Sequence, residues 1–175
     1  MIIISDAGPL LALAKVDGLA ALFRLFPKVL TPPGVHEEVV TAGLRLGASD
    51  AAVLEEAFRK GLLELSAPAE ATSLPIPLTL GRGELESIRL AIERNADWLL
   101  IDDLDARRGA LANFEAAGIR SQVKGTLGVI VSACQQRHLA KREAIELVHA
   151  LSRRQDVWLS ANLCQRVVEI LSQEP

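Results

Sequence analysis

Residues 2–9 read IIISDAGP, a run of three isoleucines followed by an acid and a turn with glycine and proline. β-Branched residues favour strands, and a run without polar alternation is typical of a strand buried on both faces. We therefore expect a buried strand that ends at Asp6. Proline is favoured in the first turn of a helix, because the N–H that it lacks has no partner there. We therefore expect a helix from Pro9.

A second apolar run, WLLI at residues 98–101, ends in the same way at Asp102 and Asp103. Short apolar runs alternate with amphipathic stretches along the chain, and residues 66–80 are expected to be a loop. Apolar strands separated by helices are typical of a parallel sheet covered on both faces, which predicts an α/β fold. Further strands are expected at 28–31, 62–65 and 119–123, with a strand-like piece near Trp158. Further helices are expected at 32–40, 49–60, 83–94 and 104–116, and two or three more over 126–150 and 161–173.

The composition predicts one globular domain over residues 1–175, because 50% of the 175 residues are hydrophobic and 23% are charged. The net charge of −3 argues against polyanion binding by the chain as a whole. Aromatic residues make up only 3%, which argues against an aromatic stacking platform for single-stranded nucleic acid. The apolar runs are too short for a membrane span, and neither a signal peptide nor a disulfide scaffold is recognisable. We therefore expect a cytoplasmic protein.

Acids follow two of the expected strands: Asp6 after the first, and Asp102 and Asp103 after the run at 98–101. Asp105 comes next, at the start of a helix. Ligands of open parallel sheets bind at the carboxyl ends of the strands, near a switch in strand order. The alternative is a helix N-cap, in which the carboxylate accepts hydrogen bonds from free N–H groups. That alternative is weaker for the adjacent pair, because one cap needs one acid.

Glu84 stands at the head of the apolar stripe of the helix at 83–94. Residues three, four and seven positions further on are Ser87, Ile88 and Ala91, which share its face. Glu86 is expected on the opposite, solvated side. A carboxylate on a buried face must be paired, hydrogen-bonded or bound to metal. The alternative for Glu84 is a first-turn acid stabilised by the helix dipole.

Glu37 and Glu38 compete for a similar role on the helix after Pro33. Glu38 shares a face with Val35 and Ala42, which tilts it inward, although a solvated face remains an alternative for both acids. None of the three histidines follows a metal-ligand spacing, so the candidate ligands are all carboxylates. Oxygen donors alone select hard cations such as Mg²⁺ or Mn²⁺, and such a site in an α/β protein is suited to hydrolysis of phosphate esters.

Five segments, in this order, resemble the PIN-domain family and most closely its DUF3368 branch, which is related to VapC-type toxins. The resemblance covers residues 1 to about 140 and implies a PIN-like three-layer α/β/α sandwich with a mainly parallel sheet. It also implies a Mg²⁺- or Mn²⁺-dependent ribonuclease, often the toxin of a toxin–antitoxin pair, with RNA, a cognate antitoxin and a second copy as partners. The segments are SDAGPL at 5–10, PPGVHEEV at 32–39, GRGELESI at 81–88, LLIDD at 99–103 followed by ARR at 106–108, and GTLGV at 125–129.

Residue by residue, the resemblance implies four catalytic acids, of which the helix acid is the loosest match because Glu37 and Glu38 compete for it. A second ion or the attacking water would be held by Glu38 or Asp105. Thr126 stands where some members carry another acid or polar group. The implied catalytic residues are Asp6, Glu38, Glu84 and Asp103, and the metal ligands are Asp6, Glu84, Asp102, Asp103 and Asp105. Near the rim of the expected site, the candidate RNA contacts are Arg107, Arg108, Lys124 and Thr126, with a solvated helix face as the alternative for the arginines.

Two alternatives remain open from the sequence. One is a binding module with the same fold and acids but little nuclease activity. The other is a receiver-like signalling domain, which would also use Mg²⁺ and a lysine such as Lys124, but which expects its paired acids after the first strand. The C-terminal helical pattern at 139–173 either completes the core or forms an interface with a second copy or a partner helix.

Overall fold

The computed structural model describes residues 1–69 and 80–173. Its centre is a five-stranded sheet in the order β3-β2-β1-β4-β5, with all neighbours parallel. The chain starts in the middle of the sheet, so the strand order switches between β1 and β4. The parallel sheet expected from the apolar runs is therefore confirmed. The strands are β1 (Ile3–Ser5), β2 (Val29–Thr31), β3 (Leu63–Leu65), β4 (Trp98–Leu100) and β5 (Gln122–Lys124).

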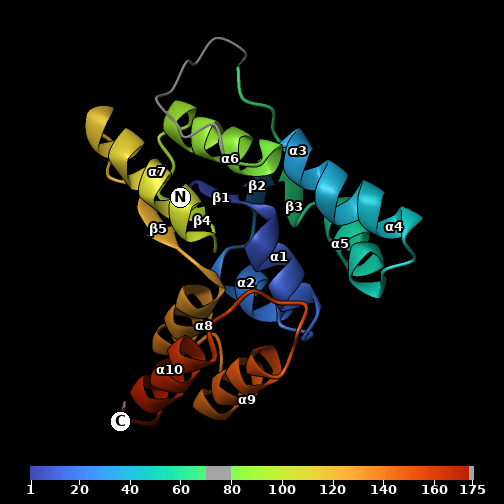
Figure 1. The fold of residues 1–175 in the computed structure, drawn as a ribbon, viewed down its shortest axis with the longest axis vertical. Helices are drawn as coiled ribbons and strands as arrows, with labels where there is room; N and C mark the ends of the chain where they lie inside the picture. The colour runs from blue at the N-terminus through green and yellow to red at the C-terminus, as the bar shows by residue number, and fades with distance from the viewer. Residues whose placement is uncertain (70–79, 174–175) are drawn as a thin grey trace.

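Helices cover both faces of this sheet, which gives the expected α/β/α sandwich (Figure 1). Ile4 and Leu99 pack into the core cluster under α6 and α7, whereas Ile3 and Leu100 pack into the cluster with α1, α2 and α8. This alternation follows from the two-residue period of a strand. The helical elements are α1 (Ala7–Ala14), α2 (Leu19–Leu25), α3 (Pro33–His36), the π-helical η1 (Glu37–Ala42), α4 (Gly43–Arg45), α5 (Ser49–Arg59), α6 (Arg82–Glu93), α7 (Leu104–Ala116), α8 (Thr126–Gln135), α9 (Lys141–Ser152) and α10 (Ala161–Gln173).

The C-terminal helices lie beyond α8, at the end of the molecule away from α6 (Figure 1). Side chains of α9 and α10, including Val148, Leu151 and Leu171, are buried in the same core cluster as side chains of α1 and α2. This part of the chain therefore contributes to the core. None of the helices within the described ranges is long and apolar enough to cross a membrane.

Several boundaries differ from the sequence expectations. The first helix begins at Ala7 rather than Pro9, and β5 begins at Gln122 rather than Ile119. The piece around Trp158 is an irregular loop rather than a strand, whereas the helices expected over 126–150 and 161–173 are present as α8, α9 and α10. Most of the loop expected at 66–80 lies outside the described residues.

The helix expected at 32–40 continues as far as Arg45, and its middle, η1, is a π-helix. A π-helical segment places one more residue in a turn than an α-helix does, and such segments are frequent at functional sites. The faces of this helix therefore cannot be assigned from the 3.6-residue period on which the sequence analysis relied.

Candidate active site

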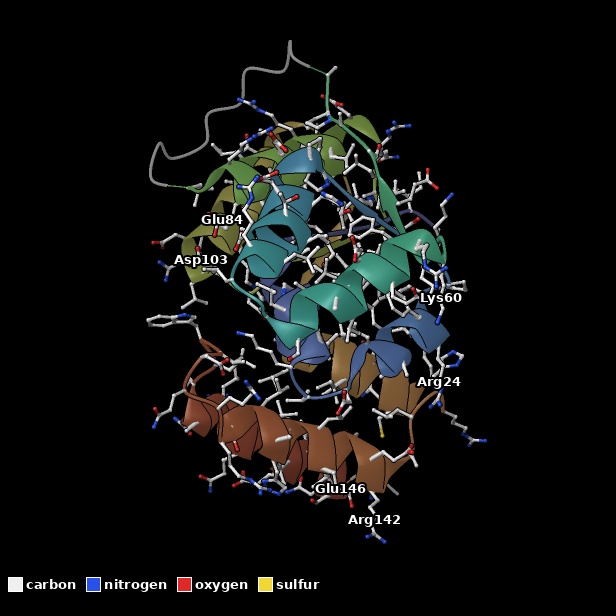
Figure 2. The ribbon with its side chains drawn as sticks, turned by 90° about the vertical axis from the view of Figure 1, so that its right-hand side faces the viewer. Arg24, Lys60, Glu84, Asp103, Arg142 and Glu146 are labelled. Atoms are coloured by element: carbon white, nitrogen blue, oxygen red, sulfur yellow. The ribbon has the colours of Figure 1, made fainter. Side chains whose placement is uncertain are left out.

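Acidic side chains from four different segments line one cavity of about 770 Å³. The cavity lies at the carboxyl ends of β1 and β4, where the strand order switches. Glu84 and Asp103 lie together at one edge of the molecule, whereas Arg142 and Glu146 lie at the opposite end (Figure 2). We call this hollow the acid cavity. Its acidic residues are Asp6, Glu38, Glu84, Asp102, Asp103 and Asp105.

Asp6 is the most buried of these acids, with 6% of its surface exposed. Its backbone N–H donates to the carbonyl oxygen of Leu100 at 2.9 Å, which fixes the residue at the end of the sheet. Asp6 is also the N-cap residue of α1, although no side-chain capping hydrogen bond closes. Burial raises the pKa of Asp6 to about 7 against the backbone N–H groups of Ala7 and Gly8 at the start of that helix, which lower it. The charges of Glu84 and Glu38 raise this pKa further. A carboxylate in this position would be stabilised by a cation.

Glu84 lies in the first turn of α6, and its Oε2 accepts a hydrogen bond from the N–H of Gly81 at 2.8 Å. Burial raises the pKa of Glu84, and Asp103 raises it further, against the hydrogen bond from Gly81. Ser87 and Ile88 are buried, as the helical stripe predicts. Glu84 therefore combines the first-turn position with a place in the acid cavity.

The structure distinguishes between the two candidate acids of η1. Glu38 lines the acid cavity, where desolvation raises its pKa and Glu84 raises it further, although Glu38, like Glu37, is exposed to solvent. Glu37 is exposed and forms an ion pair with Arg45, at 3.7 Å between Oε1 and Nη1. Glu38 is therefore the acid of this pair that lies near Glu84 and Asp6.

Asp103 and Asp105 begin α7. Asp103 is the N-cap of this helix, and its Oδ1 accepts a hydrogen bond from the N–H of Ala106 at 2.8 Å. Asp105 is exposed and pairs with Arg108 at 3.4 Å. Both acids and Arg108 line the acid cavity. The capping interpretation thus holds for Asp103. The charge of Asp103 also raises the pKa of Glu84.

Asp102 is held in a different set of contacts. Its Oδ1 accepts a hydrogen bond from the backbone N–H of Thr126, and its Oδ2 accepts one from the Thr126 hydroxyl group. Burial raises the pKa of Asp102, although the bonds from Thr126 and the charge of Arg107 act in the other direction. A Cβ atom at Gly125 would lie 2.5 Å from Oδ1, so this close approach requires glycine.

A second hollow of about 520 Å³ adjoins the acid cavity, and Asp102, Leu104 and Trp158 line both. We call it the apolar groove, because leucine, valine and tryptophan side chains dominate its lining. Arg107 and Lys124 also line it. The ammonium group of Lys124 lies 3.9 Å from the ring centroid of Trp98 and donates to Ser132 at 2.9 Å. Two of the expected RNA-contacting cations therefore lie beside the acid cavity rather than in it.

Two residues that the sequence analysis did not assign to the site also border or support it. Glu86, expected on the solvated side of its helix, accepts a hydrogen bond from the N–H of Gly34 at 2.6 Å and pairs with Arg82. The expectation for Glu86 was therefore wrong, because α3 packs against α6 on that side. Trp158 lines the acid cavity although it lies in a distant loop. The four-residue spacing of Arg82 and Glu86 was a local signal for the ion pair of Glu86. No local pattern marked Trp158 as a residue of the site.

No three His, Cys, Asp or Glu side chains among residues 1–69 and 80–173 stand close enough together to hold a metal ion as they are arranged. The acids line one cavity without converging on a common point. A family model described as PIN domain, DUF3368, matches residues 2–173. No curated protein and no solved structure matches the chain.

Proposed function

Because this chain belongs to the DUF3368 family of PIN domains, which are generally nucleases, we propose that it is a metal-dependent ribonuclease that hydrolyses RNA phosphodiester bonds. The observation that carries the proposal is the buried carboxylate of Asp6, which shares its cavity with Glu38, Glu84 and Asp103. Like charges in a partly desolvated cavity repel one another, and a bound cation would relieve that repulsion.

The donor set fits Mg²⁺ or Mn²⁺. Carboxylate oxygens are the ligands that these hard cations prefer, and Mg²⁺ keeps several water molecules while binding one or two carboxylates directly. Asp6, Glu84 and Asp103 are the proposed ligands, with Asp102 and Asp105 at the edge of the site. A bound ion would polarise the phosphoryl oxygen and lower the pKa of water.

The remaining roles, which are positioning the ligands, activating water and binding phosphate, fall to side chains of the protein. Asp6 is fixed by the sheet and Asp103 by its helix cap, so both carboxylates are held by regular structure. Glu38 has a raised pKa and lies at the accessible side of the cavity, which supports a role in orienting the attacking water and accepting its proton. Asp105 is the weaker candidate for that role, because it is paired with Arg108. Arg108, exposed on the lining of the acid cavity, is the proposed phosphate contact.

The test is cleavage of a mixed RNA pool with Mg²⁺ or Mn²⁺, with EDTA and Asp103→Asn as negative controls. Asparagine caps helices as well as aspartate does, so Asp103→Asn is expected to fold while losing activity. Glu37→Gln is the matched control, because Glu37 is exposed outside the cavity lining, and this variant is expected to cleave like the parent. Mn²⁺ binding without RNA cleavage would support the alternative of a non-catalytic binding module.

The finer proposal is a toxin of a toxin–antitoxin pair in the cytoplasm, formed by residues 1–175 as one domain and acting as a homodimer. Exposed apolar side chains on the outer helices, among them Leu111, Leu163 and Ile170, support a protein partner or a second copy. Light scattering after size-exclusion chromatography tests the dimer. Copurification of a second protein that suppresses RNA cleavage tests the antitoxin.

A further inference from the structure

Trp158 is almost wholly exposed, at 98% of its surface, and it borders the candidate active site. It lines the acid cavity, the apolar groove and a smaller hollow of about 320 Å³ next to α1. Asp102 also lines all three. The ring therefore stands where these hollows meet, beside the carboxylates that surround the proposed reaction.

The backbone around Trp158 is held in place by its neighbours. Val157 and Leu159 are partly buried against the main core, and the N–H of Leu159 donates to the carbonyl oxygen of Val157 at 3.0 Å. This tight turn is centred on Trp158. Because the residues on either side are packed against the core, the Trp158 side chain points outward. The exposure of the ring thus results from a defined local conformation.

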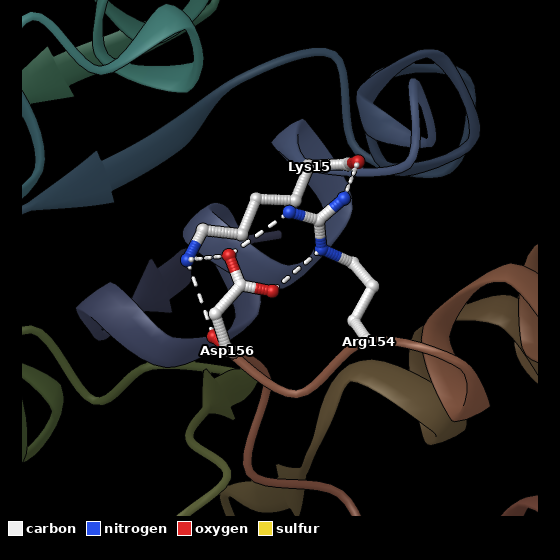
Figure 3. A network of polar contacts seen from close by, with 3 residues as sticks. All are labelled: Lys15, Arg154 and Asp156. Atoms are coloured by element: carbon white, nitrogen blue, oxygen red, sulfur yellow. Dashed lines mark hydrogen bonds and ion pairs between the residues drawn. The ribbon is translucent and has the colours of Figure 1, made fainter.

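An ion-pair network fastens the same loop to α1 (Figure 3). The carboxylate of Asp156 accepts hydrogen bonds from Arg154 at 2.8 and 2.9 Å and pairs with Lys15 at 3.1 Å. Arg154 also donates to the carbonyl oxygen of Lys15, at the end of the helix that begins after Asp6. One helix therefore connects the buried acid of the site to the loop that carries Trp158.

We propose that Trp158 is a substrate-binding residue on which one unpaired base of the RNA stacks, next to the phosphate that the acid cavity receives. The proposal rests on the proposed ribonuclease function and names its substrate class as single-stranded RNA. Unstacked bases of RNA are recognised by stacking on aromatic side chains. A single ring provides one such contact, which agrees with the low aromatic content of the chain.

The lining of the apolar groove fits a nucleotide attached to that base. Leu104, Leu163 and the Trp158 ring offer apolar surface, and the Arg107 side chain lies in the same groove with Lys124. A nucleotide whose base stacks there has its sugar–phosphate backbone near Arg107 and Lys124. The adjoining phosphate of the RNA then lies near the acid cavity. Because the ion pairs and the tight turn already order the backbone of the loop, stacking has to immobilise only the exposed Trp158 side chain.

The experiment compares Trp158→Leu, which removes the ring but keeps apolar volume, with Trp158→Phe, which keeps a ring. Binding of single-stranded RNA is measured in the presence of Mg²⁺ in an Asp103→Asn background, which prevents cleavage. Leu46→Ala is the matched control, because Leu46 is also strongly exposed and lines none of the three hollows. RNA is expected to quench the emission of Trp158, whereas Trp158→Phe reports the background from buried Trp98.

Trp158→Leu is expected to weaken RNA binding roughly 5- to 140-fold, the range for loss of one base–aromatic stack. Trp158→Phe and Leu46→Ala are expected to bind like the parent. An oligonucleotide with an abasic site at the stacked position is expected to bind parent and Trp158→Leu equally. If the wild-type protein cleaves RNA, and Trp158→Leu binds RNA like its parent in the Asp103→Asn background and cleaves it like the wild type when Asp103 is intact, the stacking proposal is wrong and the ribonuclease stands.

Two other outcomes are also decisive. If Trp158→Leu leaves RNA binding unchanged but prevents self-association or assembly with a protein partner, the loop serves a protein interface and the stacking proposal is overturned. If the wild-type protein neither binds nor cleaves RNA, the proposed function and the stacking proposal are both wrong.

Discussion

Thr126 donates two hydrogen bonds to the carboxylate of Asp102, one from its backbone N–H at 2.8 Å and one from its hydroxyl group at 2.6 Å. These bonds join the end of β4 to the first turn of α8. We expect Thr126→Val to lower the free energy of unfolding by about 1.5–3 kcal/mol, the usual range for a hydrogen bond to a charged group. Urea denaturation measures the change. Thr126→Ser keeps the hydroxyl group but removes a buried methyl group, so its expected loss is the smaller one, about 0.5–1.5 kcal/mol. Equal stability of the valine variant would contradict this account.

Asp6 predicts a pH dependence of stability in the absence of metal. Burial raises its pKa to about 7 in the folded protein, against 3.8 for a solvent-exposed aspartate carboxyl group. The folded state therefore holds a proton that the unfolded state has released, and the free energy of unfolding falls as the pH rises from about 4 to about 7.

Asp6→Asn replaces this carboxylate by a neutral side chain of similar shape. In EDTA at pH 8, we expect the variant to be more stable than the parent by up to about 4 kcal/mol, at ~1.4 kcal/mol for each pKa unit. The advantage should shrink as the pH falls towards 4, because the parent then gains its proton. Denaturation curves at several pH values measure it, with the exposed Glu115→Gln as control. A constant difference across this range would show that Asp6 does not titrate as stated.

The strand-end acids could be predicted from the sequence, because parallel strands bring their carboxyl ends to one edge whatever the details of packing. Asp6, Asp102 and Asp103 follow from that rule alone. Between Glu37 and Glu38, the α-helical period favoured Glu38, which does line the acid cavity, but η1 departs from that period, so the pattern alone does not explain the placement. The position of Trp158 beside the site could not be predicted either, because it depends on contacts between a loop and a helix that are distant in the sequence.

Glu37 and Glu38 offer a matched pair for the metal proposal. We expect Glu38→Gln to weaken Mn²⁺ binding roughly 10- to 100-fold, the range found for groups that support metal ligands, because it removes a charge that lies near Glu84. Glu37→Gln should leave the affinity unchanged, since Glu37 pairs with Arg45 outside the cavity lining. Titration calorimetry with Mn²⁺ measures both variants. Equal losses in the two would mean that only general charge near the site matters.

Glu86 lies outside the acid cavity, but we expect its substitution to affect both stability and metal binding. Its carboxylate accepts a hydrogen bond from the N–H of Gly34 at 2.6 Å and thereby joins α6, which carries Glu84, to the helix that continues into Glu38. Glu86→Ala removes the acceptor and leaves a part-buried N–H without its partner, so we expect a loss of about 1.5–3 kcal/mol in the free energy of unfolding.

The same change should also weaken Mn²⁺ binding, because the two acids would no longer be held at a fixed separation. Glu115→Ala is the control for removal of an exposed acid from a helix, and both its stability and its metal affinity should stay close to those of the parent. A Glu86→Ala protein that is destabilised but binds Mn²⁺ normally would show that the contact serves the fold alone. A protein that changes in neither respect would show that the hydrogen bond to Gly34 contributes nothing to either.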